Sequence, residues 1–366
     1  MMRHKYSYIG VAFSMAVALL LTGCTSDAED ERPMRDLYLV LGTHTYSDIS
    51  PLVTRLSLPT GYVTYDELTL KMATEKTKIR AFITQGNETK FQGDFTYKGN
   101  ATWNNKVPID EGDYYIYGFM PSSILSKVSM TVRSSDDYSN GAVMTISDLP
   151  AMTFVDPCVI VGVKGHDNSA AALADMNLQL GQFKYNAGDE GKYLYVLIDH
   201  LFAALEFNLC VDKTYNQLRT IKMTKLELEP IGGLKTVTLT ATLTQGNNSS
   251  PLAVVYDENT TATMTWQPIY DGGGITLKDE TESDYQYNFL AFVAPGENNK
   301  RFKMKTTYNV YDRKGNLIRE NCTAENTLNI PTLTRGDKYI FNLKVTPTYL
   351  YVLSEPDLDN PTVTVN

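Results

Sequence analysis

The sequence predicts an all-β protein of the sandwich type, and three observations lead to this prediction. Short apolar or alternating stretches recur at intervals of about 8–12 residues, with turn residues between them. Tyrosine is abundant, at 24 residues, and threonine is frequent, as is typical of strands. Long leucine-, alanine-, glutamate- and lysine-rich blocks with helical spacing are missing. Many short strands with almost no helix favour packed antiparallel sheets over a parallel α/β sheet.

The first 24 residues have the pattern of an export signal. Arg3, His4 and Lys5 form a basic head, and an apolar run follows over 11–21. The run ends in Leu-Thr-Gly-Cys, which resembles the lipobox of bacterial lipoproteins, in which the thiol of Cys24 would be lipidated. An ordinary cleaved signal with an unrelated cysteine is the alternative. We therefore assign 1–24 to a lipoprotein signal peptide.

Residues 25–55 are expected to form a tether and a first strand. The stretch 26–31 is acidic and polar, which indicates an extended tether, and it resembles the surface-export signals of Bacteroidetes lipoproteins. Residues 37–41 are apolar throughout and suit a strand. Thr54-Arg55 closes this region.

The next region, 56–190, is expected to be an N-terminal sandwich domain. Strands are predicted at 78–84 and at 114–120, where apolar bulk on both faces indicates burial between two layers. A further strand is predicted at 154–163, with Pro157 confining its first half to an edge or a bulge. Residues 169–182 are rich in alanine and leucine and could form a short helix. The polar, glycine-bearing stretch 187–191 is the predicted domain boundary.

Region 191–366 is expected to be a C-terminal sandwich domain with clear period-two patterns. In 235–244, for example, Val, Leu and Ala alternate with Thr, which puts one row in the core and one row in water. Residues 311–316 are a predicted hairpin turn, and Asp271 with the three glycines after it is read as a plain turn. The predicted strands are 193–198, 204–210, 235–244, 302–310, 339–345 and 349–353.

Charge and motif content argue against several functions. The chain carries 33 basic and 42 acidic side chains, a net charge of −9, and this acidic balance argues against nucleic acid as a partner. His44, His166 and His200 do not form a paired ligand motif, so we predict no metal and no cofactor, with His200 packed at a strand end. No nucleophile elbow and no phosphate-binding glycine loop is present, which predicts a protein that is not an enzyme. A β-sandwich hydrolase with paired carboxylates is the remaining enzymatic alternative.

Two further readings concern cysteine and aromatic residues. Cys158, Cys210 and Cys322 lack C-x-x-C spacing and are expected to be free thiols, the first two in the core, with a single disulfide as the alternative. The tyrosines could instead form a platform for stacking sugars, which would make the chain a monomeric glycan-binding surface lipoprotein. Only two tryptophans are present, and most tyrosines lie within strand patterns, which favours the core. Arg335-Gly336-Asp337 is read as a turn that opens a strand.

Several motifs, in a shared order, resemble the fimbrillin-like (FimA/Mfa-type) surface lipoproteins of Bacteroidales. They are the lipobox at Cys24, the strand followed by Thr54-Arg55, the segment 112–121, the segment 200–207 and the segment 330–339. The resemblance extends over most of the chain that follows the signal peptide. It implies two transthyretin-like antiparallel β-sandwich domains in tandem, on the outer membrane surface and in the fimbrium.

The resemblance also implies assembly with other fimbrial subunits by strand exchange, and adhesion to a host or bacterial surface ligand. In this family a protease cuts after an arginine and releases the lipidated leader with the first strand. Arg55 matches the processing position, and Arg35 is the weaker candidate because it precedes the strand. The donor strand would come from the C-terminal segment, with Tyr349, Tyr351 and Leu353 or Val363 and Val365 as its apolar row. The short, proline-interrupted tail leaves open a stalk, tip, accessory or anchor role.

Overall fold

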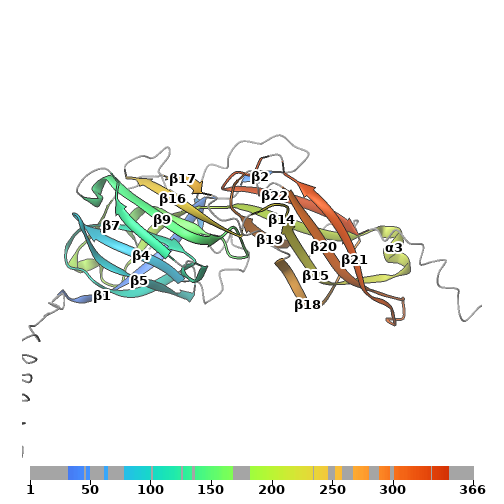
Figure 1. Ribbon diagram of the computed structural model, residues 1–366. Coiled ribbons are helices and arrows are strands. Elements are labelled where there is room, and N and C mark those ends of the chain that lie inside the picture. The colour runs from blue at the N-terminus through green and yellow to red at the C-terminus, as the bar shows by residue number, and fades with distance from the viewer. Residues whose placement is uncertain are drawn as a thin grey trace, which may run out of the picture.

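The structure is a computed structural model, and its fold is almost entirely β (Figure 1). It describes residues 32–44, 47–49, 62–64, 78–99, 102–124, 127–133, 137–167, 182–233, 235–245, 252–257, 267–279, 288–296, 301–330 and 332–345. Within these ranges the only α-helix is α3 (Lys213–Leu218), accompanied by the 3-10 turns η1 (Ser122–Ile124), η2 (Tyr138–Asn140) and η4 (Ala187–Asp189). The predicted all-β class is confirmed. Among the same residues, no helix has the length and apolar character needed to cross a bilayer.

Two lobes lie end to end in Figure 1, and we call them the first and second lobes. The larger sheet of the first lobe follows the order β11-β13-β1-β6-β5-β4-β7-β12, with β3 paired to β1. Because β11 also pairs with β7, the path from β11 to β7 closes on itself. The strands are β11 (Cys158–Asp167), β13 (Tyr193–His200), β1 (Met34–His44), β6 (Thr102–Pro108), β5 (Glu88–Gly99), β4 (Lys78–Gln85), β7 (Gly112–Met120), β12 (Phe183–Tyr185) and β3 (Tyr62–Thr64).

A second sheet completes the first lobe, and two facing sheets form the second lobe (Figure 1). The order in the first lobe is β17 (Leu252–Asp257), β16 (Thr236–Thr244), β9 (Gly141–Pro150) and β8 (Lys127–Val132). One sheet of the second lobe is β10 (Met152–Thr153), β19 (Asn288–Val293), β14 (Ala203–Val211), β22 (Asp337–Val345) and β2 (Ser47–Ile49). The other is β18 (Gln267–Thr276), β15 (Thr220–Pro230), β20 (Arg301–Tyr311) and β21 (Leu317–Asn329).

Two hydrophobic cores hold these sheets together. One fills the closed sheet and includes Leu39, Phe95 and Trp103, all fully buried. The other continues from the face that β9 and β16 cover into the second lobe, where Phe207 and Phe302 are fully buried. The period-two prediction for 235–244 is confirmed, because buried and half-buried residues alternate along the whole of β16. The continuous second core means that the two lobes share apolar packing.

The predicted division of the chain at 187–191 does not separate the sheets. β13 lies beyond that stretch, yet it pairs with β1 and β11 of the first lobe. β16 likewise pairs with β9, and β17 with β16. Each strand completes a hydrogen-bonded ladder whose other members come from earlier in the sequence, and local composition carries no information about such distant pairing. The first lobe is therefore built from both halves of the chain.

Two other expectations need correction. The sheets are not purely antiparallel, because β1 is parallel to β13, and β22 is parallel to both β14 and β2. Asp271 and the following glycines are not a plain turn but lie inside β18. The pairing of β18 with β15 shifts register there, and Gly274 has a φ of +96°, so the glycines permit an irregular strand. The helix predicted at 169–182 falls almost entirely outside the described residues.

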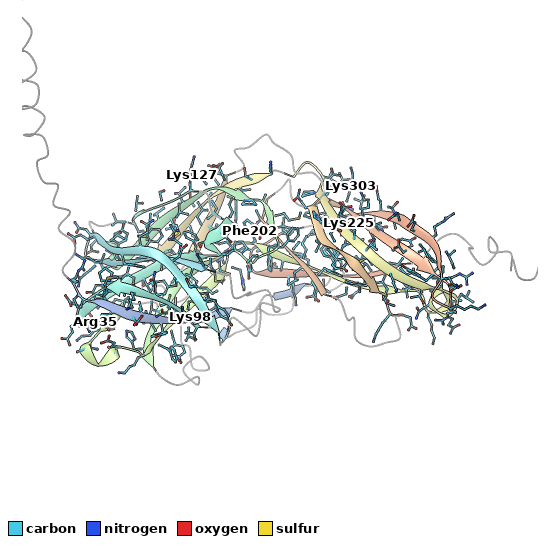
Figure 2. The ribbon with its side chains drawn as sticks, turned by 90° about the horizontal axis from the view of Figure 1, so that it is seen from below. Arg35, Lys98, Lys127, Phe202, Lys225 and Lys303 are labelled. Atoms are coloured by element: carbon cyan, nitrogen blue, oxygen red, sulfur yellow. The ribbon has the colours of Figure 1, made fainter. Side chains whose placement is uncertain are left out.

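The lobes meet where β13 turns into β14. Phe202 is fully buried at this corner and lies between the two lobes in Figure 2. Gly336, at the turn before β22, has a φ of +73° and donates its backbone N–H to the carbonyl of Phe202 at 3.0 Å. The turn predicted for Arg335-Gly336-Asp337 is confirmed. Its position at the junction was not predicted.

Candidate functional site

The candidate site is the pair of strands β1 and β2, which we call the leader strands, together with the strands that flank them. β1 lies between two neighbours, parallel to β13 over six residue pairs and antiparallel to β6 over seven. Its C-terminal end also pairs with β3. β2 then crosses to the second lobe and pairs in parallel with the start of β22. One short segment of chain thus contributes strands to both lobes.

Alternation along β1 places one row of its side chains in the core of the closed sheet. Leu37, Leu39 and Leu41 point into the closed sheet and are at most 1% exposed. Each fully buried leucine contributes roughly 1.5–3 kcal/mol through the apolar area that it removes from water. Tyr38 lies in the other row, where its ring meets that of Tyr193 edge-on at 6.1 Å. The first strand predicted at 37–41 is confirmed, and it is part of the core.

Two polar contacts are made near the start of β1. Arg35 donates from Nη1 to Glu190 Oε2 at 3.1 Å, in an ion pair that is partly exposed on both sides. Asn104 donates from Nδ2 to the carbonyl of Leu37 at 3.3 Å. Exposed ion pairs such as the first contribute about 0–1 kcal/mol, so apolar burial dominates the attachment of β1. Figure 2 shows Arg35 at the outer end of the first lobe.

The two arginines considered as processing sites differ in their surroundings. Arg35 lies within β1, opposite Val107 of β6, so its backbone is part of a paired strand. Proteases bind extended, unpaired segments, and this pairing therefore protects the bond after Arg35. Arg55 lies outside the described residues, as do Cys24, the donor residues Tyr349, Tyr351 and Leu353, and Val363 with Val365. Their roles stay predictions.

A buried polar cluster lies beside the junction of the lobes. His200, at the end of β13, is directly opposite Cys158, at the start of β11. His200 Nδ1 lies 2.7 Å from Asp156 Oδ2 and 3.5 Å from Cys158 Sγ, and all three residues are at most 2% exposed. Burial, followed by the negative charges of Asp156 and Asp199, raises the pKa of the Cys158 thiol well above its usual range. The thiol is therefore unsuited to act as a nucleophile.

This cluster brings together the three residue types that can hold a metal ion, within 4.8 Å of one another. The 2.7 Å separation of His200 and Asp156 is a hydrogen-bond distance, and it satisfies both groups without an ion. Both contacts use the same ring nitrogen, so the three residues do not form a relay in which each ring nitrogen has its own partner. Sequence reasoning placed His200 at a strand end, which the structure confirms, but missed its partners because 44 residues separate His200 from Asp156.

Several of the largest aromatic side chains that the structure describes fill a core and do not offer a surface for stacking sugars. Trp103, Tyr114, Tyr117 and Tyr185 are at most 2% exposed and fill the interior of the first lobe. Trp266 lies outside the described residues. Cys158 and Cys210 are buried free thiols, as predicted, and Cys322 is a free thiol of intermediate exposure.

No protein-family model matches the chain, and no curated protein matches it either. Among solved structures it is similar to a fimbrial protein from Bacteroides vulgatus, with 13% identity, a TM-score of 0.35 and coverage of 84% of this chain and 95% of that chain. It is also similar to the fimbrial anchor protein Mfa2 from Porphyromonas gingivalis, with 10% identity, a TM-score of 0.28 and coverage of 79% and 82%. Likeness this distant carries no argument about function, so we argue function from the strands and residues of this chain.

Proposed function

We propose that the chain is a structural or accessory subunit of cell-surface fimbriae. In this proposal it is exported as a lipoprotein, is not an enzyme, and is assembled by strand exchange after a protease removes its leader. The observation that supports this best is the position of β1. An interior strand of the first lobe comes from the short segment between the predicted lipid anchor at Cys24 and the predicted cleavage site at Arg55.

The geometry explains why one cut would prepare the chain for assembly. After cleavage at Arg55, no covalent bond would join β1 and β2 to the rest of the protein. Departure of β1 would uncover the facing edges of β6 and β13 and the core pockets of Leu37, Leu39 and Leu41. Unpaired backbone groups above apolar pockets are the surface that an added strand satisfies. A strand from the C-terminal segment of a neighbouring subunit, presenting Tyr349, Tyr351 and Leu353 or Val363 and Val365, would fill this space.

Cleavage is tested by exposing the full chain to an arginine-specific protease and following its intact mass. We expect one early cut, after Arg55, while the bond after Arg35 stays intact for as long as β1 is paired. In Arg55→Lys the early cut should disappear, whereas Arg35→Lys should be cleaved as the parent is. A first cut at any other arginine, or no cut, would remove the processing step from the proposal.

Strand exchange is tested on the cleaved protein with a synthetic peptide that covers residues 346–366. We expect the peptide to displace the leader segment, so that the mass of the complex changes and free leader is recovered. A peptide of the same composition in scrambled order is the control. Failure of the peptide to bind while the leader remains in place would argue for a chain that keeps its own first strand and does not exchange it.

A further inference from the structure

The four-stranded sheet of the first lobe ends on both sides in a short strand with an open edge. Its order is β17-β16-β9-β8, and no strand among the described residues pairs with the outer side of β17 or of β8. β17 lies along the upper side of the first lobe in Figure 1, and Figure 2 shows Lys127 of β8 at the margin of the same lobe. An open edge carries backbone N–H and C=O groups with which a further strand can pair.

The two edge strands have the same alternation of side chains. Each has six residues, and along both strands exposed residues alternate with more buried ones. The exposed row of β8 begins with Lys127, and that of β17 contains Val255, which is 67% exposed, and ends with Asp257. The inward rows are apolar and only partly buried, although they pack against the core. Their members are Val128, Met130 and Val132 on β8, and Val254 and Tyr256 on β17.

Backbone contacts at the strand ends define which length of each edge is open. Arg133 donates its N–H to the carbonyl of Gly141 on β9 at 3.3 Å. Because residues two apart in an antiparallel ladder point the same way, residues 128 and 130 direct their backbone groups away from β9. At the other margin, Arg335 reaches the carbonyl of Leu252 at 3.4 Å, so we count only 253–257 of β17 as open.

A straight row of residues joins the two edges across the sheet. Thr131 of β8 lies opposite Val143 of β9, which in turn lies opposite Thr242 of β16. Thr242 lies opposite Ala253 of β17. A second copy that is displaced sideways, without slipping along the strands, would therefore bring its Ala253 beside Thr131. The two strands would then run antiparallel, because each strand of this sheet is antiparallel to its neighbour.

In this register the side chains match on both faces of the sheet. On the exposed face Lys127 would lie directly opposite Asp257, and opposite charges in this position attract. On the inward face Met130 would lie opposite Val254, so that two half-covered apolar side chains cover each other. Lys127 is the only charged residue of β8, and Asp257 is the only one of β17. Two copies of the same edge therefore cannot form this charge pair.

We propose that the β8 edge of one copy of this chain pairs antiparallel with the β17 edge of a second copy, with Lys127 opposite Asp257. Each copy in such a pair still has one open edge of each kind, so the association continues side by side and does not stop at a dimer. The contact is separate from strand exchange, and the proposal holds even if the leader is never removed.

The charge pair is tested by sedimentation velocity on the full chain, without protease, over a range of protein concentrations. We expect Lys127→Asp and Asp257→Lys each to raise the concentration needed for association about tenfold, because an attraction becomes a repulsion. A mixture of the two variants should associate as the parent does, since every contact between them joins opposite charges. Lys98→Asp, at an exposed position of β5, is the control. A parent that stays monomeric, or a mixture no better than either variant alone, would overturn the proposal.

Oxidative cross-linking then tests which edges meet. In the proposed register Ser129 lies opposite Val255, as a close pair whose geometry suits a disulfide. Ser129→Cys and Val255→Cys are prepared separately, each together with Cys322→Ser, and are oxidised alone and mixed. We expect a disulfide-linked dimer only in the mixture.

The matched control replaces Val255→Cys with Ala253→Cys, which lies two residues out of register. Linkage in the mixture that is no more efficient than with this control would overturn the proposal. A disulfide-linked dimer of Ser129→Cys alone or of Val255→Cys alone would also overturn it, because two copies of one edge would then be paired.

Discussion

Leu39 shows how strongly the leader is built into the fold. It lies in the middle of β1, opposite Trp103, and is fully buried in the core of the closed sheet. We expect Leu39→Ala to lower the free energy of unfolding by about 2–5 kcal/mol, because the lost methyl groups leave a cavity. Urea unfolding followed by the fluorescence of the neighbouring Trp103 measures the change. Met34→Ala, at a position that is 57% exposed in the same strand, should change it little, and equal effects would place β1 outside the core.

We expect His166 to make the stability of the first lobe depend on pH. Its ring packs edge-on against Phe183 and Tyr185, and both ring nitrogens are buried without a hydrogen-bond partner. Burial lowers the pKa of His166 from its usual 6.5, more than the nearby Asp189 can compensate. The folded state therefore binds a proton less readily than the unfolded state. The contribution of neutral His166 to the free energy of unfolding should be fully present above pH 6.5. It should be lost as the pH falls from there through the folded-state pKa.

The measurement is the free energy of unfolding at pH 8 and at pH 5. We expect His166→Phe, which keeps an aromatic ring in the same packing, to lose less stability between these two values than the parent chain. The difference between the two chains isolates His166 from the carboxylates, which also titrate at low pH. A parallel decline in both would mean that His166 is not the group responsible.

At the scale of elements, β9 and β16 approach each other too closely for a side chain at one point. Gly141 has a φ of +118°, and a Cβ built there would lie 1.9 Å from the carbonyl oxygen of Leu243. Gly141→Ala should therefore destabilise the first lobe by at least the roughly 1–3 kcal/mol of a strained backbone, with the clash added. Thermal unfolding measures the loss. At Gly188 a Cβ meets nothing within 4 Å, so Gly188→Ala should be close to neutral.

Period-two patterns predicted the strands far better than they predicted the pairing. The alternation in 235–244 and 302–310 correctly indicated β16 and β20, because one row of each strand packs on a core and the other does not. Nothing in either pattern tells which strand lies alongside. The partner of β16 is β9, almost a hundred residues earlier in the sequence. Local sequence patterns therefore could not predict which strands make up each lobe.

The candidate site, too, could be predicted from the sequence only in part. The first strand at 37–41 could be read from its apolar run, and its motif context pointed to Arg55. The neighbours β6 and β13 could not be predicted, because their identity depends on how the closed sheet is ordered. The same holds for the contact between Asp156 and His200, which exists only because β11 and β13 are adjacent. Strand adjacency is thus the information that a single sequence lacked.

At the scale of the whole molecule, Arg335 connects the two lobes. Arg335 lies in the turn before β22 of the second lobe. Its guanidinium nevertheless donates to Asp199 Oδ2 at 2.9 Å and to the carbonyl of His200 at 3.0 Å, both at the end of β13 in the first lobe. It also reaches the carbonyl of Leu252 in β17 at 3.4 Å. One side chain thus joins the end of β13, the start of β17 and the second lobe. This arrangement should hold the two lobes in a fixed orientation.

We expect Arg335→Ala to cost about 2–3 kcal/mol, since it removes hydrogen bonds to a charged group at the junction. The substitution should weaken the coupling between the lobes more than it destabilises either core. In calorimetry we therefore expect the single unfolding transition of the parent to separate into two. Small-angle scattering should show a broader range of shapes. Arg301→Ala, which removes only an exposed contact with Asn329 in the second lobe, is the control. If both variants keep one transition at the parent temperature, the continuous apolar core alone couples the lobes and the arginine is dispensable. A split seen only in Arg335→Ala would make this residue the point at which lobe orientation, and with it the path from β1 to β2, is set.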